Sequence, residues 1–234
     1  RVSVDFLGGI PKVRFKKRRK KKSYLLLLDG QDKIPVLGES LRTIRTRVIK
    51  EAEASGMKKI LITSAAAGEG KTTFAVNLAI ALAKKRKKVI LIDADFRNPS
   101  VAKAMGFDSV TKGIQEVLET GEGQEMREKL KEVMLTYKDI GLQVLPGEKA
   151  VKSPSRILGD HALADLLDIL SEEAEYIIVD TPPCGILSDA SVLARKMDGV
   201  IMVVRQDYTR LDRVLTGMGN IADTGAKLLG YVLN

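Results

Sequence analysis

The chain has 234 residues, of which 44% are hydrophobic and 29% are charged, so it holds enough apolar material for one globular domain of ordinary size. This composition excludes a disordered or collagen-like protein, and a single cysteine, Cys184, excludes an intramolecular disulfide. No apolar run approaches the roughly 20 residues that a membrane-spanning helix needs, and a reducing, cytosolic setting fits best.

The net charge of +9 is concentrated at the start of the chain. Residues 1–22 hold 10 lysines and arginines against Asp5 alone, and the rest of the chain carries equal numbers of both signs. The basic residues 16–22 repel one another and are expected to stay solvated. Three interpretations are open: a soluble tail or tag, a nucleic-acid arm, and a segment that binds an anionic membrane surface through residues 12–22. Because only Phe15 is available to stack on a base, nucleic acid is disfavoured and the membrane surface is preferred.

A domain boundary is predicted near Gly38. Residues 1–37 are interpreted as the basic arm followed by a short docking segment, which contains Leu25–Leu28 and a turn around Pro35. Residues 38–234 form the domain proper, and its first element, over residues 39–54, has the apolar spacing of an amphipathic helix.

Further along the chain, short apolar runs alternate with stretches long enough for helices. Such runs are typical of parallel strands that are buried on both faces. The alternation predicts an α/β fold with a mostly parallel sheet and helices on both of its faces. The predicted strands are 59–63, 89–92, 142–145, 176–179, 200–204 and 227–233. The predicted helices are 72–85, 153–173, 187–196 and 209–222, and residues 111–138 are interpreted as a peripheral insertion with one or two surface helices.

The first of these strands leads directly into a phosphate-binding loop and then into an apolar helix, the context that a P-loop requires. Small residues let backbone N–H groups close around phosphate oxygens, and the helix N-terminus favours an anion. We expect Lys71 to reach the β and γ phosphates and the Thr72 hydroxyl to ligate Mg²⁺. Ala65 replaces the first glycine of the usual pattern, which therefore fails at one position. The nucleotide-binding residues predicted in the loop are Ala67, Gly68, Glu69, Gly70, Lys71, Thr72 and Thr73.

Two later strands end in carboxylates: Asp93 and Asp95 follow one, and Asp180 follows the other. Ligands of doubly wound sheets lie beyond the carboxyl ends of the strands, so these three side chains are expected beside the loop. Asp180 is the Walker B-like candidate, linked to Mg²⁺ through water. Of Asp93 and Asp95, one is expected to face the metal while the other serves structure. Helix capping or turn formation is the alternative for both.

From about Pro35 to Asn234 the chain resembles a known family, the bacterial tyrosine kinases of capsule and exopolysaccharide synthesis, which adapt the MinD-like P-loop ATPase fold. The most specific match is residues 89–100, which look like that family's Walker A′ segment. Further matching segments are 180–183 together with 188–190, 198–205 and 230–234.

The resemblance implies a protein-tyrosine kinase that uses ATP and Mg²⁺, with Lys71, Asp93 and Asp95 as catalytic residues and with residues 38–234 as the kinase domain. Asp93 is implied as the base, or base-orienting group, for the tyrosine hydroxyl, and Thr72, Asp93 and Asp180 as neighbours of the metal. Asn234 stands where related ATPases use an asparagine to read adenine.

The resemblance also implies partners. Glu39, Arg42 and Arg45 match the family's E-x-x-R-x-x-R interface motif, which implies a homo-oligomeric ring; a solvated helix face is the alternative. A membrane activator protein of a polysaccharide export system and a protein tyrosine substrate are implied as well. The expected location is cytoplasmic, peripheral at the inner face of the cell membrane.

The family usually ends in a tyrosine-rich tail, whereas the five tyrosines here are scattered, so this sequence does not predict autophosphorylation of a tail. Tyr24, beside the basic arm, is the acceptor that we expect to be most exposed. Two other functions stay open. A MinD- or ParA-type ATPase switch is disfavoured because Ala66 stands at the position of its signature lysine, and an ATP-gated scaffold would need no kinase activity.

Overall fold

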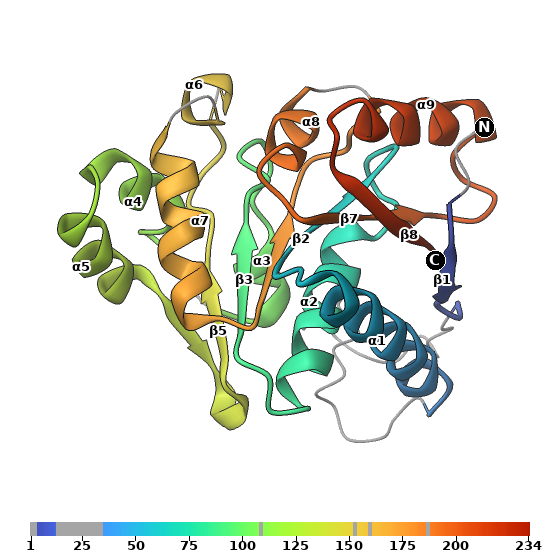
Figure 1. The fold of residues 1–234 in the computed structure, drawn as a ribbon, viewed down its shortest axis with the longest axis horizontal. Helices are drawn as coiled ribbons and strands as arrows, with labels where there is room; N and C mark the ends of the chain where they lie inside the picture. The colour runs from blue at the N-terminus through green and yellow to red at the C-terminus, as the bar shows by residue number, and fades with distance from the viewer. Residues whose placement is uncertain (1–3, 13–34, 108–109, 152–153, 159–160, 186–187) are drawn as a thin grey trace, which may run out of the picture.

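The computed structural model describes residues 4–12, 35–107, 110–151, 154–158, 161–185 and 188–234. Within these residues, eight strands form one sheet in the order β1-β8-β7-β2-β6-β3-β5-β4 (Figure 1). Neighbouring strands run parallel, except for the antiparallel pair of β4 and β5. The strands are β1 (Phe6–Gly9), β2 (Lys59–Ser64), β3 (Val89–Asp93), β4 (Leu135–Tyr137), β5 (Leu142–Leu145), β6 (Tyr176–Asp180), β7 (Gly199–Val204) and β8 (Lys227–Leu233).

Helices cover both faces of the sheet, which confirms the predicted mostly parallel α/β architecture. They are α1 (Pro35–Ser55), α2 (Lys71–Ala83), α3 (Val101–Met105), α4 (Ile114–Thr120), α5 (Gln124–Val133), α6 (Pro154–Leu158), α7 (His161–Glu173), α8 (Asp189–Ala194) and α9 (Leu211–Ala222), with a 3-10 turn at Lys138–Ile140. None of the helices that the structure describes is both long and apolar enough to cross a membrane.

The core consists of two apolar clusters, one on each face of the sheet. Alternate residues of a strand point to opposite faces, so Leu61 of β2 packs with α4 to α9, whereas Ile60 and Ile62 pack with α1, α2 and α3. Both clusters are almost fully shielded from water. The central strands are therefore continuously apolar because they are buried on both faces, as predicted from the sequence.

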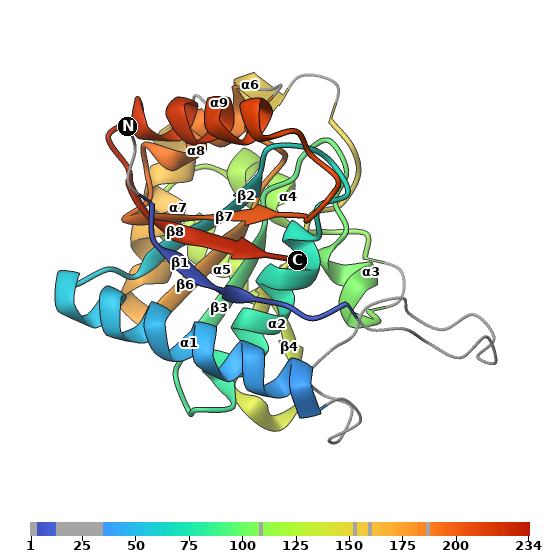
Figure 2. The ribbon, with the colours of Figure 1, turned by 90° about the vertical axis from the view of Figure 1, so that its right-hand side faces the viewer.

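The sequence did not predict β1. Residues Phe6–Gly9 pair with the end of β8 and lie along the outer edge of the sheet, as Figure 2 shows. They belong to the sheet rather than to a separate arm. The predicted membrane-binding run, apart from Lys12, and the docking segment up to residue 34 lie outside the described residues. The helix expected over 39–54 is α1, which begins earlier, at Pro35.

The segment 111–138, expected to hold one or two helices, holds two, α4 and α5, together with the unpredicted edge strand β4. The amphipathic helices bury one face each, including Ile114, Met126 and Leu130, in the same core cluster as α7. The short helix α3 was also not predicted. It follows the Walker A′-like segment directly, and this position matters for the site described next.

Candidate nucleotide site

The phosphate-binding loop joins the end of β2 to the start of α2 at the carboxyl end of the sheet. Gly68 and Gly70 have φ angles of 81° and 92°, in the left-handed region that favours glycine. A Cβ added at Gly70 would lie only 2.2 Å from the side-chain nitrogen of Asn234. The backbone of this loop therefore takes a shape that its glycines permit, with the N-terminus of the 13-residue helix α2 beneath it.

Glu69 braces the loop from inside. Its side chain is fully buried, and its carboxylate accepts hydrogen bonds from the N–H of Ala66 at 2.6 Å and from the N–H of Arg205 at 3.3 Å. Asn234 adds a second brace, because its side-chain amide donates to the Glu69 carbonyl at 2.7 Å. Both residues were predicted to bind nucleotide. In the geometry observed here, their side chains bond to the protein, and they fix the shape of the loop.

Lys71 at the start of α2 pairs with Asp95, its Nζ lying 2.8 Å from Oδ2. The side chains are only 12% and 5% exposed, so this ion pair is shielded from water. Burial lowers the pKa of the Lys71 ammonium, but Asp180 and Asp95 raise it by more, and the net shift of the pKa is upward. Lys71 is therefore held as a cation at the mouth of the loop.

Thr72 donates its hydroxyl hydrogen to Asp180 Oδ2 at 2.7 Å, while Oδ1 of the same fully buried carboxylate has no hydrogen-bond partner. Burial raises the pKa of Asp180 to about 6, and Lys71 opposes this shift. A buried carboxylate oxygen without a partner is costly unless something satisfies it. The residues fit Mg²⁺, which prefers hard oxygen ligands and binds through one or two carboxylates together with phosphates. No cluster of three or more metal-ligating side chains occurs in the described part of the chain.

Asp93 ends β3 and is almost fully buried. Its Oδ2 accepts from the backbone N–H groups of Ser100 and Val101 at 2.8 and 2.9 Å, at the start of α3, and its Oδ1 accepts from the N–H of Asp95 at 3.2 Å. Burial, followed by the charge of Asp180, raises the pKa of Asp93 to about 7, although these hydrogen bonds oppose the rise. Oδ2 of Asp93 therefore caps the start of α3, as the helix-capping alternative predicted. Oδ1 accepts only one long hydrogen bond and can accept another.

An ion pair that sequence reasoning missed joins two of the family-like segments. Arg97 of the Walker A′-like segment contacts Asp189 of α8, with Nε 2.6 Å from Oδ2 and a second contact at 3.3 Å. Asp189 is buried, so removal of Arg97 would leave a buried carboxylate without its charged partner. It ties the end of β3 to the segment after β6. Both segments were recognised separately in the sequence, but nothing in their spacing indicated the contact.

The loop after β7 also touches the phosphate-binding loop. The guanidinium of Arg205 donates to the Gly68 carbonyl at 3.1 Å and lies 4.6 Å from the centre of the Tyr208 ring. A Cβ added at Gly68 would lie 2.9 Å from the Tyr208 hydroxyl. No sequence pattern indicates this contact of Tyr208, which stands in a turn without a motif of its own.

The three interface candidates lie on α1. Glu39 and Arg42 are exposed and pair with each other at 3.3 Å. Arg45 is half-buried and donates to the Ala81 carbonyl of α2 at 3.4 Å, while its Nε has no partner. Burial, and then Arg42, lower the pKa of this guanidinium. One face of α1 thus carries two exposed charges of opposite sign.

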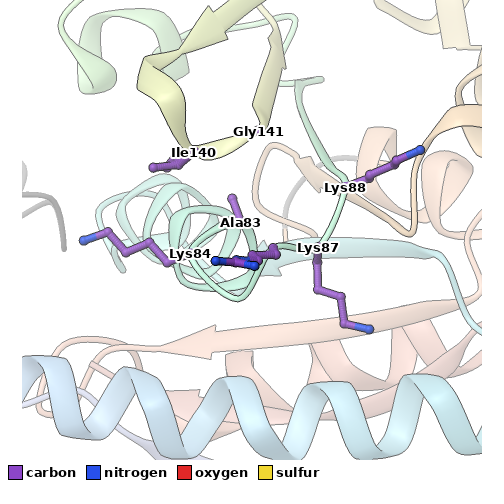
Figure 3. A pocket seen from close by; sticks show the side chains of 7 residues that line it. Ala83, Lys84, Lys87, Lys88, Ile140 and Gly141 are labelled. Atoms are coloured by element: carbon purple, nitrogen blue, oxygen red, sulfur yellow. The ribbon is translucent and has the colours of Figure 1, made fainter.

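A cavity of about 430 Å³ lies at the opposite end of the sheet, away from these residues. Figure 3 shows that the side chains of Lys84, Lys87 and Lys88 around it point in different directions. These three side chains do not converge on one point. It is lined by Ala83, Lys84, Arg86, Lys87, Lys88, Ile140 and Gly141.

Comparison with known proteins identifies the fold and the family of this chain. A family model described as an AAA domain matches residues 57–226. The structure of the septum site-determining protein MinD with Mg-ADP from Pyrococcus horikoshii shares the fold, with a TM-score of 0.63 at 23% identity over 76% of this chain and 70% of that chain. The family match shows that the chain contains an AAA domain, and the structural match shows that its fold is that of MinD.

Nearer relatives narrow the class. The tyrosine-protein kinase YwqD of Bacillus subtilis is 32% identical over 84% of this chain and 80% of its own length. The crystal structure of the chimerical protein CapA2B2 matches with a TM-score of 0.85 at 30% identity, covering 99% of this chain and 94% of that chain. The chain belongs to the bacterial tyrosine-protein kinases.

Proposed function

We propose that this chain transfers the γ-phosphoryl group of Mg-ATP to a tyrosine hydroxyl, with the carboxyl end of the sheet as the reaction site. One observation carries the proposal: in a member of this kinase family, Lys71 and Thr72 of the phosphate-binding loop each contact a buried acid at the end of a neighbouring strand. Phosphoryl transfer depends on alignment and charge neutralisation, and this arrangement supplies fixed charges for both.

Each residue has a distinct part in the proposal. Backbone N–H groups from Ala67 to Thr73 hold the triphosphate, and Lys71 leaves Asp95 to neutralise the β and γ phosphates as they arrive. Thr72 and Asp180 hold Mg²⁺, with Asp93 nearby, and the unpartnered Oδ1 of Asp180 is the position that a cation or its water would satisfy. A metal held by these residues would supply positive charge to offset the negative charge that develops on the phosphate oxygens.

Asp93 is proposed to take the phenolic proton. Its Oδ2 is held by two backbone N–H groups, which fixes the orientation of the carboxylate, and its Oδ1 can accept a proton. Asp95 is proposed to position Lys71 before ATP binds. Asn234 is proposed to lie beside the adenine while it braces the loop through Glu69.

The direct test is incubation of the protein with γ-labelled ATP and Mg²⁺, in the presence of a tyrosine-containing acceptor such as poly(Glu,Tyr). Label on tyrosine is expected. Label released only as free phosphate would overturn the kinase proposal and favour an ATPase switch of the MinD or ParA kind. An ATP-gated scaffold would bind ATP, but it would put no label on tyrosine and would release almost no labelled phosphate.

We also propose a ring of identical chains that uses Glu39, Arg42 and Arg45. Support comes from the exposure of Glu39 and Arg42 on one face of α1. Light scattering on Arg42→Glu should report a smaller assembly than on the unchanged chain. Lys50→Glu, an exposed change of the same charge on the same helix, is the matched control. Equal sizes for all three proteins would contradict the ring.

Residues 12–22 are proposed to bind an anionic membrane surface, which would place the kinase at the inner face of the cell membrane. Capsule or exopolysaccharide synthesis and a membrane activator protein are the proposed setting. The fraction of protein that sediments with phosphatidylglycerol vesicles should fall as salt rises, and phosphatidylcholine vesicles should bind little of the protein. Replacement of the lysines among residues 16–22 by glutamine should remove the binding. Salt-independent binding would contradict the proposal.

A further inference from the structure

Tyr208 differs from the other tyrosines that the structure describes. Its side chain is 53% exposed, whereas Tyr137 and Tyr176 are only 5% and 3% exposed and Tyr231 is half-buried in β8. Among the described residues it is thus the tyrosine that another protein molecule reaches most easily. Tyr24, the acceptor expected from the sequence, lies outside them.

Tyr208 also lies against the nucleotide loop. Its hydroxyl comes within 2.9 Å of the position that a Cβ on Gly68 would occupy, and its ring is covered by the guanidinium of Arg205. The same guanidinium donates to the Gly68 carbonyl at 3.1 Å. A charge placed on the Tyr208 hydroxyl would therefore act directly on the loop that grips the triphosphate and on the arginine that braces it.

We propose that Tyr208 is an acceptor tyrosine, modified by a second copy of this chain, and that its phosphate weakens nucleotide binding to the modified copy. The inference rests on the proposed kinase function. In the reaction, the Tyr208 oxygen forms a bond to the γ-phosphorus of ATP, and the bond from that phosphorus to the bridging oxygen of ADP breaks. The phenolic proton passes to Asp93 of the copy that binds the ATP, and ADP leaves.

Sheet order explains why the donor is a second copy. Tyr208 follows β7, whereas Asp93 ends β3, and the order β7-β2-β6-β3 separates these strands by three steps. Adjacent strands lie about 4.8 Å apart, so the two strand ends are about 14 Å apart. This is farther than one tyrosine side chain extends. The Tyr208 hydroxyl itself lies beside Gly68, with Arg205 over the ring, so we expect a second copy to supply the proton acceptor.

The effect on nucleotide follows from charge. A phosphotyrosine carries nearly two negative charges and pairs strongly with arginine. It would draw Arg205 away from the Gly68 carbonyl and place negative charge beside the site of the triphosphate. Like charges at this range repel even when solvent partly screens them, so we expect ATP affinity to fall by about tenfold.

The modification is tested with two variants of the full chain mixed together with Mg-ATP. One is Lys71→Met, which serves as an inactive acceptor, and the other is Tyr208→Phe, which serves as an active donor. Trypsin releases residues 206–210 as one peptide, and mass spectrometry should find phosphate on Tyr208 of the acceptor chain. Lys71→Met alone should show none.

A parallel reaction with poly(Glu,Tyr) separates the two proposals. Phosphate on poly(Glu,Tyr) without phosphate on Tyr208 would overturn this inference and leave the kinase function standing. Absence of phosphate on any tyrosine would overturn the kinase function, and this inference with it.

The regulatory effect is tested by binding of a fluorescent ATP analogue before and after incubation with Mg-ATP. The unchanged chain should lose about tenfold in affinity after incubation and regain it after phosphatase treatment. Tyr208→Phe should show no change on incubation, whereas Tyr231→Phe, the matched control, should behave like the unchanged chain. Equal affinity of the phosphorylated and dephosphorylated forms would overturn the regulatory part.

Discussion

The two ends of the sheet carry the same kinds of charged side chain in opposite settings. At the carboxyl end, Lys71 and Asp95 form a shielded pair beside two further buried acids. At the amino end, Lys87 contacts Glu53 and Glu175, each at 3.2 Å, and all three side chains are more than a quarter exposed. Buried charges retain strong interactions and must be matched, whereas exposed pairs are screened and contribute little. Burial, rather than the number of charges, distinguishes the functional end.

The sharpest way to test this contrast is to remove one lysine from each end. Lys71→Met takes the cation from the phosphate-binding loop and leaves Asp95 buried without its partner. Phosphoryl transfer from labelled ATP should fall by about a thousandfold or more. Lys87→Met, the matched control, should keep activity within about twofold and change the free energy of unfolding by about 1 kcal/mol or less. Equal losses in both variants would show that the effect is one of folding.

A pair of aspartates gives the next largest effect. Asp180→Asn removes the carboxylate proposed to hold Mg²⁺, so binding of a fluorescent ATP analogue in the presence of Mg²⁺ should weaken by about tenfold or more. Binding in EDTA should hardly change. The ligand-free protein should lose little stability, because the lost attraction between Asp180 and Lys71 is offset by removal of the cost of burying the Asp180 charge.

Asp198 at the amino end is the control for that change. Its Oδ2 accepts from the N–H groups of Lys58 and Lys59 at 2.8 and 2.7 Å. Asp198→Asn should lower the free energy of unfolding by about 1 kcal/mol, measured by urea titration, without altering the dependence of ATP binding on Mg²⁺. The comparison fails if the two variants show the same metal dependence.

Two glycines with positive φ allow a backbone test of smaller size. Gly70→Ala would place a methyl group on the side-chain nitrogen of Asn234 and break its contact with the Glu69 carbonyl, so ATP affinity should fall by several-fold to about tenfold. Gly141→Ala meets nothing within 4 Å. It should cost only about 1 kcal/mol for its φ of 73° and leave ATP affinity intact. Isothermal titration and urea unfolding of both variants would decide.

The smallest effect concerns Cys184, whose thiol lies behind the loop and donates to the Ser64 carbonyl at 3.4 Å. Burial raises the pKa of this thiol from 9.0 to about 11. The reactive thiolate is therefore scarce in the folded protein up to this higher pH, and the free energy of unfolding should decline as pH rises above 9.0. Iodoacetamide at mildly alkaline pH should leave the native mass unchanged and add one adduct in guanidinium chloride. Rapid labelling of the native protein would show that this end of the sheet admits water.

The sequence identified those parts of the site whose chemistry depends on local order. A strand, a glycine-containing turn and a helix must follow one another for a phosphate-binding loop, so Lys71 and Thr72 were recognised directly. The parallel sheet then placed Asp93, Asp95 and Asp180 together, because the ends of its parallel strands meet at one edge.

The contacts that sequence reasoning missed are long-range or carry no pattern. The hydrogen bonds from Ala66 and Arg205 to the Glu69 carboxylate depend on the orientation of that side chain, which the amino-acid sequence of the loop does not indicate. The strand β1 has only four residues, two of them glycines, which weakens any strand signal. A Cβ at Gly8 would lie 2.6 Å from Ile44, so α1 packs too closely there for a side chain.

The position of β1 shows that the basic residues 12–22 lie between two elements of the domain rather than in a terminal arm. Because β1 precedes residues 12–22 and α1 follows them, the segment is an internal connection whose two ends are both anchored in the same domain. A surface that holds it restrains the domain at two points. One of these points is β1, which pairs with β8, and β8 leads to Asn234 against the nucleotide loop. A pull on the chain after β1 would therefore act on a strand that only β8 separates from the nucleotide loop.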